Sequence, residues 1–260
     1  MRILYPHNPL TPTQADEPYQ AEYEAALADG LACSLFDFDA LALGEFLMRG
    51  AIAPKEPVLY RGWMLSPSRY QSLVHFIEQQ GGVPITSTAD CLRCHHLPKW
   101  YEDCRELTAE THFFAADTDI VPAAMALGWP NYFVKDYVKS NTGDKGSIAQ
   151  TAAEIPKILE QLALYRGEIE GGIALRKVEA YQPETEIRYF VANGTAHSAT
   201  GDIPNLVEAV THRIKPPFYS VDVVSTTEGK LRLIELGDGQ VSGRKNWPVT
   251  DFVQILQTFC

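Results

Sequence analysis

The chain of 260 residues lacks long hydrophobic runs and has fewer basic than acidic residues. No apolar stretch approaches the ~18–20 residues of a membrane span, so we expect no membrane partner. The 22 Lys and Arg residues stand against 33 Asp and Glu, which leaves a formal charge of −11. This balance argues against a nucleic-acid partner, because phosphate contacts need clustered cations. Residues 1–6 lack the apolar core of a signal peptide, and we therefore expect a cytoplasmic protein.

Three common catalytic motifs are also missing. The sequence contains no GxSxG elbow, no GxxxxGK[ST] phosphate loop and no GxGxxG fingerprint. These absences argue against a serine hydrolase of the elbow type, a P-loop enzyme and a dinucleotide-binding fold with its usual signature. The chemistry has to come from other residues.

Cysteine is sparse and odd in number, which indicates free thiols in a cytoplasmic chain. Three of the five lie close together, and the segment 91–95 reads CxxCH. That pattern attaches c-type haem, but such attachment normally follows export, and no signal is visible. Zinc needs four ligands, and a second CxxC or HxxxH pair is missing. The segment is therefore either structural or a zinc site, with candidate ligands Cys91, Cys94, His95 or His96, and Cys104.

The length suits one large domain or two to three small lobes, and the alternation of elements predicts a mixed α/β (α+β) fold. In the first ~110 residues, strands are expected at 2–5, 57–63 and 83–85, and helices over 17–31 and from Ser66 and Pro67 onwards. Strand–helix–strand order predicts a partly parallel sheet. Residues 107–129 are expected to be a connector with helical patches.

The second half predicts further strands, with two helices among them. We expect strands at 131–137, 171–178, 186–192 and 196–200, and helices over 152–165 and 251–259. Residues 218–243 predict a hairpin whose turn lies at 226–230. Each run of this hairpin carries one acid among aliphatic residues, Asp222 and Glu235. Buried carboxylates are costly unless a partner neutralises them, so the two acids either face solvent or hold Mg²⁺.

Other charged residues precede this hairpin in a specific order. Lys135 lies on a strand, and a polar, glycine-containing loop follows at 139–147. Glu186 and Arg188, two residues apart on a strand, share one face. Taken singly, each feature is weak evidence, but their order together is far more specific.

This order resembles the ATP-grasp superfamily over residues 119–243. The resemblance rests on the motifs YFVK at 132–135, Glu186-x-Arg188, Asp222 and IELGD at 234–238. It implies a Rossmann-like pre-ATP-grasp lobe at 1–118, with the run YRGWM at 60–64 as its most distinctive segment. A small lid lobe at 119–178 and a C-terminal metal and substrate lobe at 179–260 would clasp ATP. The chain length is similar to that of a clade of small ATP-grasp proteins suspected to be amide or peptide ligases.

The resemblance also implies roles for single residues. Lys135 would contact the α and β phosphates, and Arg188 the γ-phosphate or the acyl phosphate. The triphosphate would be covered by a loop that includes Ser140, Asn141, Thr142 and Gly143. The adenine would lie against a hinge that includes Arg176, Lys177, Val178 and Glu179, with Glu179 or a neighbour near the ribose. Mg²⁺ would be held by Asp222 and Glu235.

One position departs from the family pattern. The family usually has Glu-x-Asn on the second metal strand, whereas Gly237 occupies the Asn position here and Asp238 follows. Asp238 then takes the third-ligand role, or the second Mg²⁺ is weakly held. Substrate contacts are expected from Arg61, Trp63, Gln240, Ser242 and Arg244.

The implied reaction joins a carboxylate to an amine at the expense of ATP. A carboxylate is a poor electrophile, and transfer of the γ-phosphate turns it into an acyl phosphate that an amine attacks. The protein would act by positioning the reactants and by neutralising charge. The expected partners are a small-molecule or peptide carboxylate and an amine nucleophile. The alternatives are a catalytically inactive or regulatory ATP-binding protein of the same fold, and a zinc module at residues 91–104.

Overall fold

The computed structural model describes residues 1–138 and 146–260, except for the side chains of residues 165 and 166. Packing divides the chain into two compact units. The first comprises Met1–Cys94, Arg188–Val221 and Gly237–Cys260, and the second comprises His95–Ile187 and Asp222–Leu236. The three lobes expected from the sequence have other boundaries, and they stay a prediction.

A parallel sheet forms the centre of the first unit. Its strands run in the order β2-β1-β3-β4, and every neighbouring pair is parallel. Ile3, Leu4 and Tyr5 on the central strand are fully buried, as expected for a sheet covered on both faces. The predicted partly parallel sheet is thus confirmed. Its strands are β1 (Arg2–Pro6), β2 (Ala32–Phe36), β3 (Pro57–Tyr60) and β4 (Val83–Pro84).

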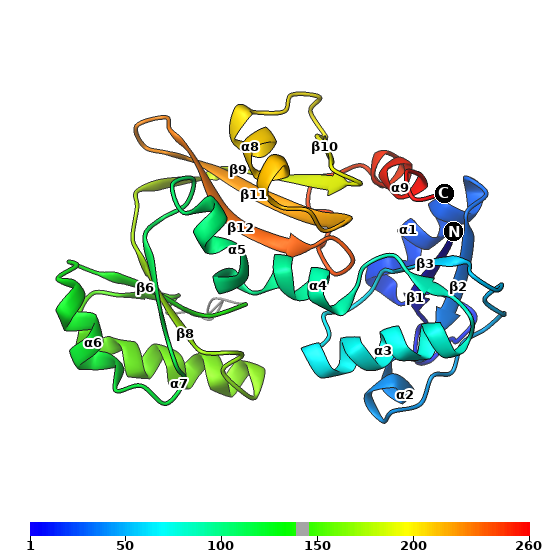
Figure 1. The fold of residues 1–260 in the computed structure, drawn as a ribbon, viewed down its shortest axis with the longest axis horizontal. Helices are drawn as coiled ribbons and strands as arrows, with labels where there is room; N and C mark the ends of the chain where they lie inside the picture. Colours follow the sequence, from blue (N-terminus) through cyan, green and yellow to red (C-terminus); the bar gives the residue numbers. More distant parts are fainter. Residues whose placement is uncertain (139–145) are drawn as a thin grey trace. The chain divides into compact units, whose positions relative to one another are not determined.

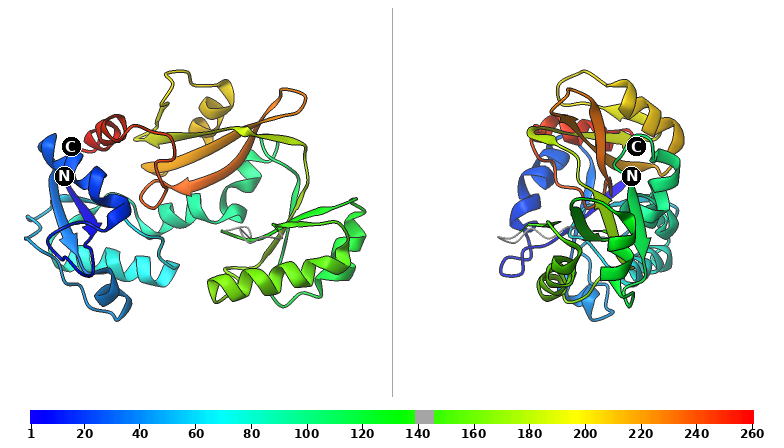
Figure 2. Two further views of the ribbon diagram at one scale, coloured as in Figure 1. Left: turned by 180° about the vertical axis from the view of Figure 1, so that it is seen from behind. Right: turned by 90° about the vertical axis from the view of Figure 1, so that its left-hand side faces the viewer.

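Helices flank this sheet, and α1 packs against α9 beside it (Figure 2). Helix α3 begins as predicted, because the Ser66 hydroxyl accepts from the Arg69 N–H and proline follows the cap. Helix α1 ends at Ala28, and Gly30 just beyond it adopts a φ of 77°. The residues after Leu31 form β2, which the sequence did not predict. The helices of the first unit are α1 (Glu17–Ala28), α2 (Phe38–Ala42), α3 (Pro67–Gln79), α4 (Thr88–His95), α9 (Val249–Gln257) and, packed on β10 of the third sheet, α8 (Asn205–Arg213).

The second unit contains an antiparallel sheet in the order β5-β8-β6-β7. Helices α6 and α7 lie along one side of β6 and β8 (Figure 1) and bury Val134 and Leu175 with them. The expected connector thus holds a strand and a helix. The elements are α5 (Leu97–Cys104), β5 (Thr111–Phe114), α6 (Ile120–Leu127), β6 (Tyr132–Asp136), β7 (Ile148–Ala149), the 3₁₀ turn η1 (Ala152–Glu154), α7 (Ile155–Arg166) and β8 (Ile173–Lys177).

A third sheet has the order β10-β9-β11-β12, and the division between the units falls within three of its strands. The predicted hairpin is confirmed as β11 and β12, joined by a turn in which Gly229 has a φ of 81°. In the described parts of the chain, no helix has the length and hydrophobicity of a membrane-crossing segment. The strands are β9 (Tyr181–Ala192), β10 (Thr195–His197), β11 (Phe218–Thr226) and β12 (Leu231–Asp238).

Candidate active site

A cavity of about 390 Å³ lies in the second unit, among residues from β6 to β9 and from the hairpin β11–β12. Apolar side chains supply much of its lining: Phe133, Ile148, Val178, Pro183, Val224 and Ile234. Charged side chains complete it: Lys135, Arg176, Lys177, Glu179, Glu186 and Glu235. Apolar walls with a few convergent charged groups are typical of a small-molecule site.

The register of β6 and β8 explains why Lys135 faces this cavity. Lys135 pairs with Ala174, and Phe133 pairs with Arg176. Because side chains alternate along a strand, these residues share one face, and Val134 between them enters the core. Sequence reasoning identified the lysine but not Phe133, whose position two residues away was the available signal.

Lys135, the residue that the resemblance assigns to the phosphates, has a buried side chain. Its side chain is 5% exposed, and its Nζ lies 3.7 Å from Glu235 Oε2. The same Nζ donates to the Val138 carbonyl at 3.4 Å. A buried ammonium needs an anion, so the Lys135–Glu235 pair is a place where a ligand's anion and a metal cation could each find an opposite charge.

Arg176 is a second buried cation beside the cavity. Its Nε donates to Thr111 Oγ1 at 3.3 Å, and its Nη1 donates to the Ile234 carbonyl at 2.7 Å. Among the described residues, no partner is found for its buried Nη2. Burial lowers the pKa of this guanidinium. An under-compensated buried cation fits an anionic or acceptor-rich ligand in the adjoining space.

In the hinge segment, which continues beyond the end of β8, one residue makes contacts that the sequence did not predict. Lys177 is half-exposed, and Val178 lines the cavity. The Glu179 carboxylate, however, forms a two-bond ion pair with Arg232 at 2.8 and 2.9 Å and accepts from the Tyr181 hydroxyl at 2.9 Å. Burial raises the pKa of Glu179, but these hydrogen bonds outweigh it and hold the pKa below its ordinary value.

The two acids of the hairpin both belong to the second unit. Glu235 lines the cavity, and so does Val224 on β11. Asp222 is two residues from Val224 on the same strand and therefore shares its face. Asp222 is 4% exposed, so its carboxylate is set in a largely water-free position.

The other expected phosphate ligands are not among the lining residues of this cavity or lie outside the described residues. Arg188 belongs to the first unit, where its Nη1 donates to the Gly243 carbonyl at 2.8 Å. Glu186, two residues earlier, lines the cavity. Ser140, Asn141, Thr142 and Gly143 lie outside the residues that the structure describes.

Arg61 is held in the core of the first unit, in an arrangement that the sequence did not reveal. Its guanidinium donates two hydrogen bonds of 2.8 Å to the Glu22 carboxylate. Its Nη1 donates to the carbonyls of Gly239, Gln240 and Ser242, at 2.7, 2.9 and 3.2 Å. Arg61 therefore fixes the backbone of the loop after β12. Glu22 reads in the sequence as an ordinary helix residue and gave no signal of this role.

Trp63 and Arg244 lie nearer the surface of the same unit. The Trp63 indole N–H donates to Asp16 at 2.8 Å, and its ring is 41% exposed. Arg244 Nη1 donates to the Trp247 carbonyl at 3.1 Å, and its Nε lies 3.8 Å from Glu22. Trp63 is thus the most accessible of the substrate contacts expected from the first half of the chain.

Asp238 is fully buried in the first unit and is engaged by neighbours. Its carboxylate accepts from the Gln240 backbone N–H at 3.1 Å, from Gln240 Nε2 at 3.0 Å and from the Cys91 thiol. Gln240 Nε2 also bonds the Tyr70 hydroxyl at 2.8 Å. Burial raises the pKa of Asp238. These contacts give Asp238 and Gln240 a structural role in closing the loop.

The packing around Gly237 explains why glycine stands where the family usually has asparagine. A Cβ at this position would lie 2.7 Å from Ser242 Oγ and 2.8 Å from Ser220 Oγ. The two hydroxyls bond each other at 2.7 Å, and Ser242 Oγ also donates to the Asp238 carbonyl at 2.8 Å. The hydroxyl pair thus occupies the space that a longer side chain would need.

The cysteine segment offers no metal site in the described structure. Cys94 and Cys104 are buried, Cys91 is partly buried, and none of the three forms a disulfide. Within residues 1–138 and 146–260, no group of three or more His, Cys, Asp or Glu side chains is arranged to hold a metal ion. The zinc alternative has no structural support there. An Mg²⁺ site completed by phosphate oxygens needs only one or two carboxylates.

Known structures share the architecture of the whole chain. An ATP-grasp RimK domain protein from Sphaerobacter thermophilus matches with a TM-score of 0.65 and 16% identity, over 99% of this chain and 98% of that one. The D-alanine-D-alanine ligase from Coxiella burnetii gives 0.64 and 11%, over 98% and 94%. The ATP-grasp ligase PsnB, complexed with a precursor variant, Mg and ADP, gives 0.60 and 11%, over 99% and 97%. At such identities the likeness establishes the fold.

A family model gives the more specific result, although no curated protein matches the sequence. The model describes the ATP-grasp domain, R2K clade family 3, and it matches residues 126–256. The matched segment includes the strand of Lys135 and the hairpin of Asp222 and Glu235. Because the match extends over more than half of the chain, this protein belongs to the ATP-grasp family, in R2K clade family 3.

Proposed function

We propose that the protein is an ATP- and Mg²⁺-dependent ligase that joins a carboxylate to an amine through an acyl phosphate. The observation that carries this proposal is the Lys135–Glu235 pair, with Nζ and Oε2 3.7 Å apart, inside a cavity that apolar side chains line together with further charged ones. A planar base suits the apolar walls, and a polyphosphate with its metal ion suits the charged residues.

The residues of this cavity divide between base and phosphates. The side chains of Phe133, Ile148 and Val224 would enclose the base, while Lys135 would hold phosphate oxygens. The carboxylates of Glu235 and Asp222 would hold Mg²⁺ through oxygen, its preferred ligand. The buried Nη2 of Arg176, without a partner among the described residues, adds a positive charge beside the same space.

Bound ATP supplies the phosphoryl group that activates the carboxylate, and bound Mg²⁺ offsets the charge of the phosphates. The chain's own residues hold the reactants in place and exclude water, without acting as a covalent nucleophile. Ligase activity is also part of the names of two similar structures, the D-alanine-D-alanine ligase and PsnB, and the latter holds Mg and ADP. Arg61 supports the loop after β12, and Trp63 is the substrate contact we favour in the first unit.

Titration calorimetry with ATP, with and without Mg²⁺, tests the nucleotide site. Saturating Mg·ATP should also raise the melting temperature, since ligand at a hundred times its Kd adds about 2.7 kcal/mol to stability. ADP release in the presence of mixed carboxylates and amines then tests the reaction. Absence of binding at millimolar ATP would remove the proposal. Tight binding without turnover on any mixture would favour the regulatory alternative.

A further inference from the structure

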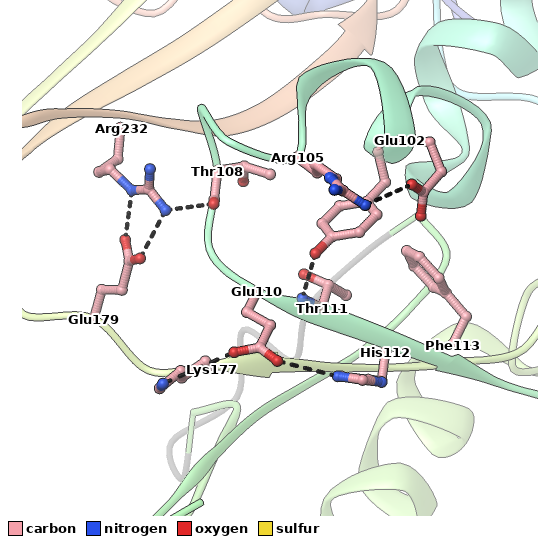
Figure 3. Close-up of a pocket in the computed structure, with 11 residues that line it drawn as sticks. Glu102, Arg105, Thr108, Glu110, Thr111, His112, Phe113, Lys177, Glu179 and Arg232 are labelled. Atoms are coloured by element: carbon pink, nitrogen blue, oxygen red, sulfur yellow. Dashed lines mark hydrogen bonds and ion pairs between the residues drawn. The ribbon is translucent and has the colours of Figure 1, made fainter. Parts of the chain in front are cut away.

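A second, larger cavity of about 760 Å³ lies in the same unit and contains a partly buried ion pair (Figure 3). Arg232 Nε and Nη2 donate to the two carboxylate oxygens of Glu179 at 2.9 and 2.8 Å. The side chains are 10% and 27% exposed. Arg105 and Glu102, in the same cavity, are 69% and 75% exposed and 3.7 Å apart. Exposed pairs of that kind contribute little, so the Arg232–Glu179 pair stands out.

Arg232 also bonds the chain segment that precedes β5. Its Nη1 donates to the Glu106 carbonyl at 3.0 Å, and its Nη2 donates to the Thr108 carbonyl (Figure 3). Thr108 in turn donates through its hydroxyl to the Leu233 carbonyl at 2.7 Å. Strand β12 is therefore tied on one side to residues 106–108 and on the other to Glu179.

Arg176 makes the same connection in the opposite direction. It lies on β8, and its Nη1 donates to the Ile234 carbonyl on β12 at 2.7 Å. Arg232 lies on β12 and reaches Glu179, two residues beyond the end of β8. Each of the two strands thus carries an arginine that hydrogen-bonds to the segment of the other strand. Ile234 directly precedes Glu235, and the hinge residues Lys177 and Val178 lie between Arg176 and Glu179.

We infer that Arg232 and Glu179 are positioning residues, which hold the strand of Glu235 against the hinge and so set the width of the nucleotide cavity. This inference rests on the proposed function. Glu179 then acts through Arg232, because its carboxylate oxygens are already occupied by Arg232 and Tyr181. The resemblance instead implied that Glu179 or a neighbour lies near the ribose.

Positioning has a measurable signature that direct contact lacks. When only a fraction of the molecules has the competent cavity, the apparent Kd rises by the inverse of that fraction for every ligand of the site. Loss of the Arg232–Glu179 ion pair should therefore raise the Kd of ATP and the Kd of ADP by the same factor. Loss of a contact to the γ-phosphate, which ADP lacks, should instead weaken ATP and leave ADP unchanged.

The test uses the full chain with Mg²⁺ and titration calorimetry. Arg232→Met should weaken ATP and ADP equally, by about tenfold, the value expected for removal of a hydrogen-bonded charge partner. Arg232→Lys should recover part of the loss. Arg105→Met is the matched control, because it removes an exposed guanidinium from the same cavity, and its Kd should equal that of the wild type. Far-UV circular dichroism of each variant verifies the fold.

Two further measurements keep the inference open to rejection. If Arg232→Met does not fold, Glu179→Gln decides, and it should weaken ATP and ADP by a common factor. With 2′,3′-dideoxy-ATP, the factor lost on Glu179→Gln should equal that with ATP; a smaller factor would mean that Glu179 reads the ribose. Wild-type affinity in folded Arg232→Met would overturn the inference while the nucleotide site stands. Failure of the wild type to bind ATP would instead reject the proposed function.

Discussion

The side-chain nitrogen of Lys135 lies 3.7 Å from Oε2 of Glu235, and the lysine is far more buried than its partner, at 5% against 38% exposure. The carboxylate therefore remains accessible to a metal ion from the cavity, while the ammonium lies deeper. Strands β6 and β12 bring together two residues that are far apart in the sequence. Their opposite charges allow the cavity to accept an anion and a cation together.

Glu235→Gln should abolish the effect of Mg²⁺ on nucleotide binding. The amide removes the negative charge while keeping the size of the side chain, so a carboxylate ligand of the metal is lost. Titration calorimetry with ATP should give the same Kd with and without Mg²⁺ in this variant. Glu228→Gln, in the exposed turn of the hairpin, is the control and should keep the Mg²⁺ effect. An unchanged Mg²⁺ effect in Glu235→Gln would show that the metal binds elsewhere.

Lys135→Met should weaken ATP more than adenosine. The ammonium would donate to phosphate oxygens, and charged hydrogen bonds contribute about 1.5–3 kcal/mol. We therefore expect a loss of about tenfold or more for ATP and little change for adenosine. Lys157→Met, an exposed lysine on α7 outside the cavity lining, is the control and should leave both affinities unchanged. Equal losses for both ligands would assign Lys135 a structural role.

Glu22→Gln should destabilise the protein strongly, although Glu22 is far from the nucleotide cavity in the sequence. The change removes the charge that compensates the buried Arg61 guanidinium. Breaking one side of a buried ion pair costs about 3–5 kcal/mol. Urea denaturation measures this loss. Glu24→Gln, on the exposed side of the same helix, should stay within about 0.5 kcal/mol of the wild type, and an equally small change in Glu22→Gln would contradict the prediction.

Gly237→Asn should destabilise the protein and should not create a better metal site. The new side chain would begin 2.7 Å from Ser242 Oγ. Overpacking of this kind costs about 1–3 kcal/mol. Thermal unfolding should show a lower melting temperature, and calorimetry should show no gain in Mg²⁺ affinity. Gly243→Asn is the control, because a Cβ there meets no atom within 4 Å.

The Glu179 carboxylate should make stability sensitive to acid. Its pKa in the folded protein lies below the ordinary value of 4.5. A depressed pKa stabilises the fold above the unfolded-state pKa, and this contribution is lost as the pH falls through the folded-state value. Urea denaturation at several pH values below about 4.5 should therefore show a smaller loss of stability in Glu179→Gln than in the wild type. If the free energy of unfolding falls equally with pH in both proteins, the ion pair contributes nothing to stability.

The fold was largely predictable because its elements carry local signals. Ser66 and Pro67 marked the start of α3, and the alternating aliphatic runs of 218–238 marked the hairpin. Strand β2 escaped prediction, since its five residues, Ala32–Phe36, directly follow the expected helix. Short strands such as β5 gave no periodic pattern long enough to recognise.

The candidate site was predictable only in part, because pairing across the chain decides its details. Lys135 and Glu235 were found from their strands, and the cavity brings them together. The engagement of Glu179 by Arg232 was not foreseen, since it joins residues 53 positions apart. The same holds for Arg61, an expected substrate contact whose partner Glu22 is 39 positions away.

The hydroxyl pair beside Gly237 implies an order in which substitutions can accumulate at three positions. Asparagine at 237 becomes tolerable only after Ser220 and Ser242 have lost their hydroxyls or changed rotamer, because both now occupy its space. Loss of the Ser242 hydroxyl in turn removes its bond to the Asp238 carbonyl. Relatives that carry the Glu-x-Asn form should therefore differ together at the positions of Ser220 and Ser242. The combined replacement Ser220→Ala, Ser242→Ala and Gly237→Asn should be more stable than the sum of its single effects.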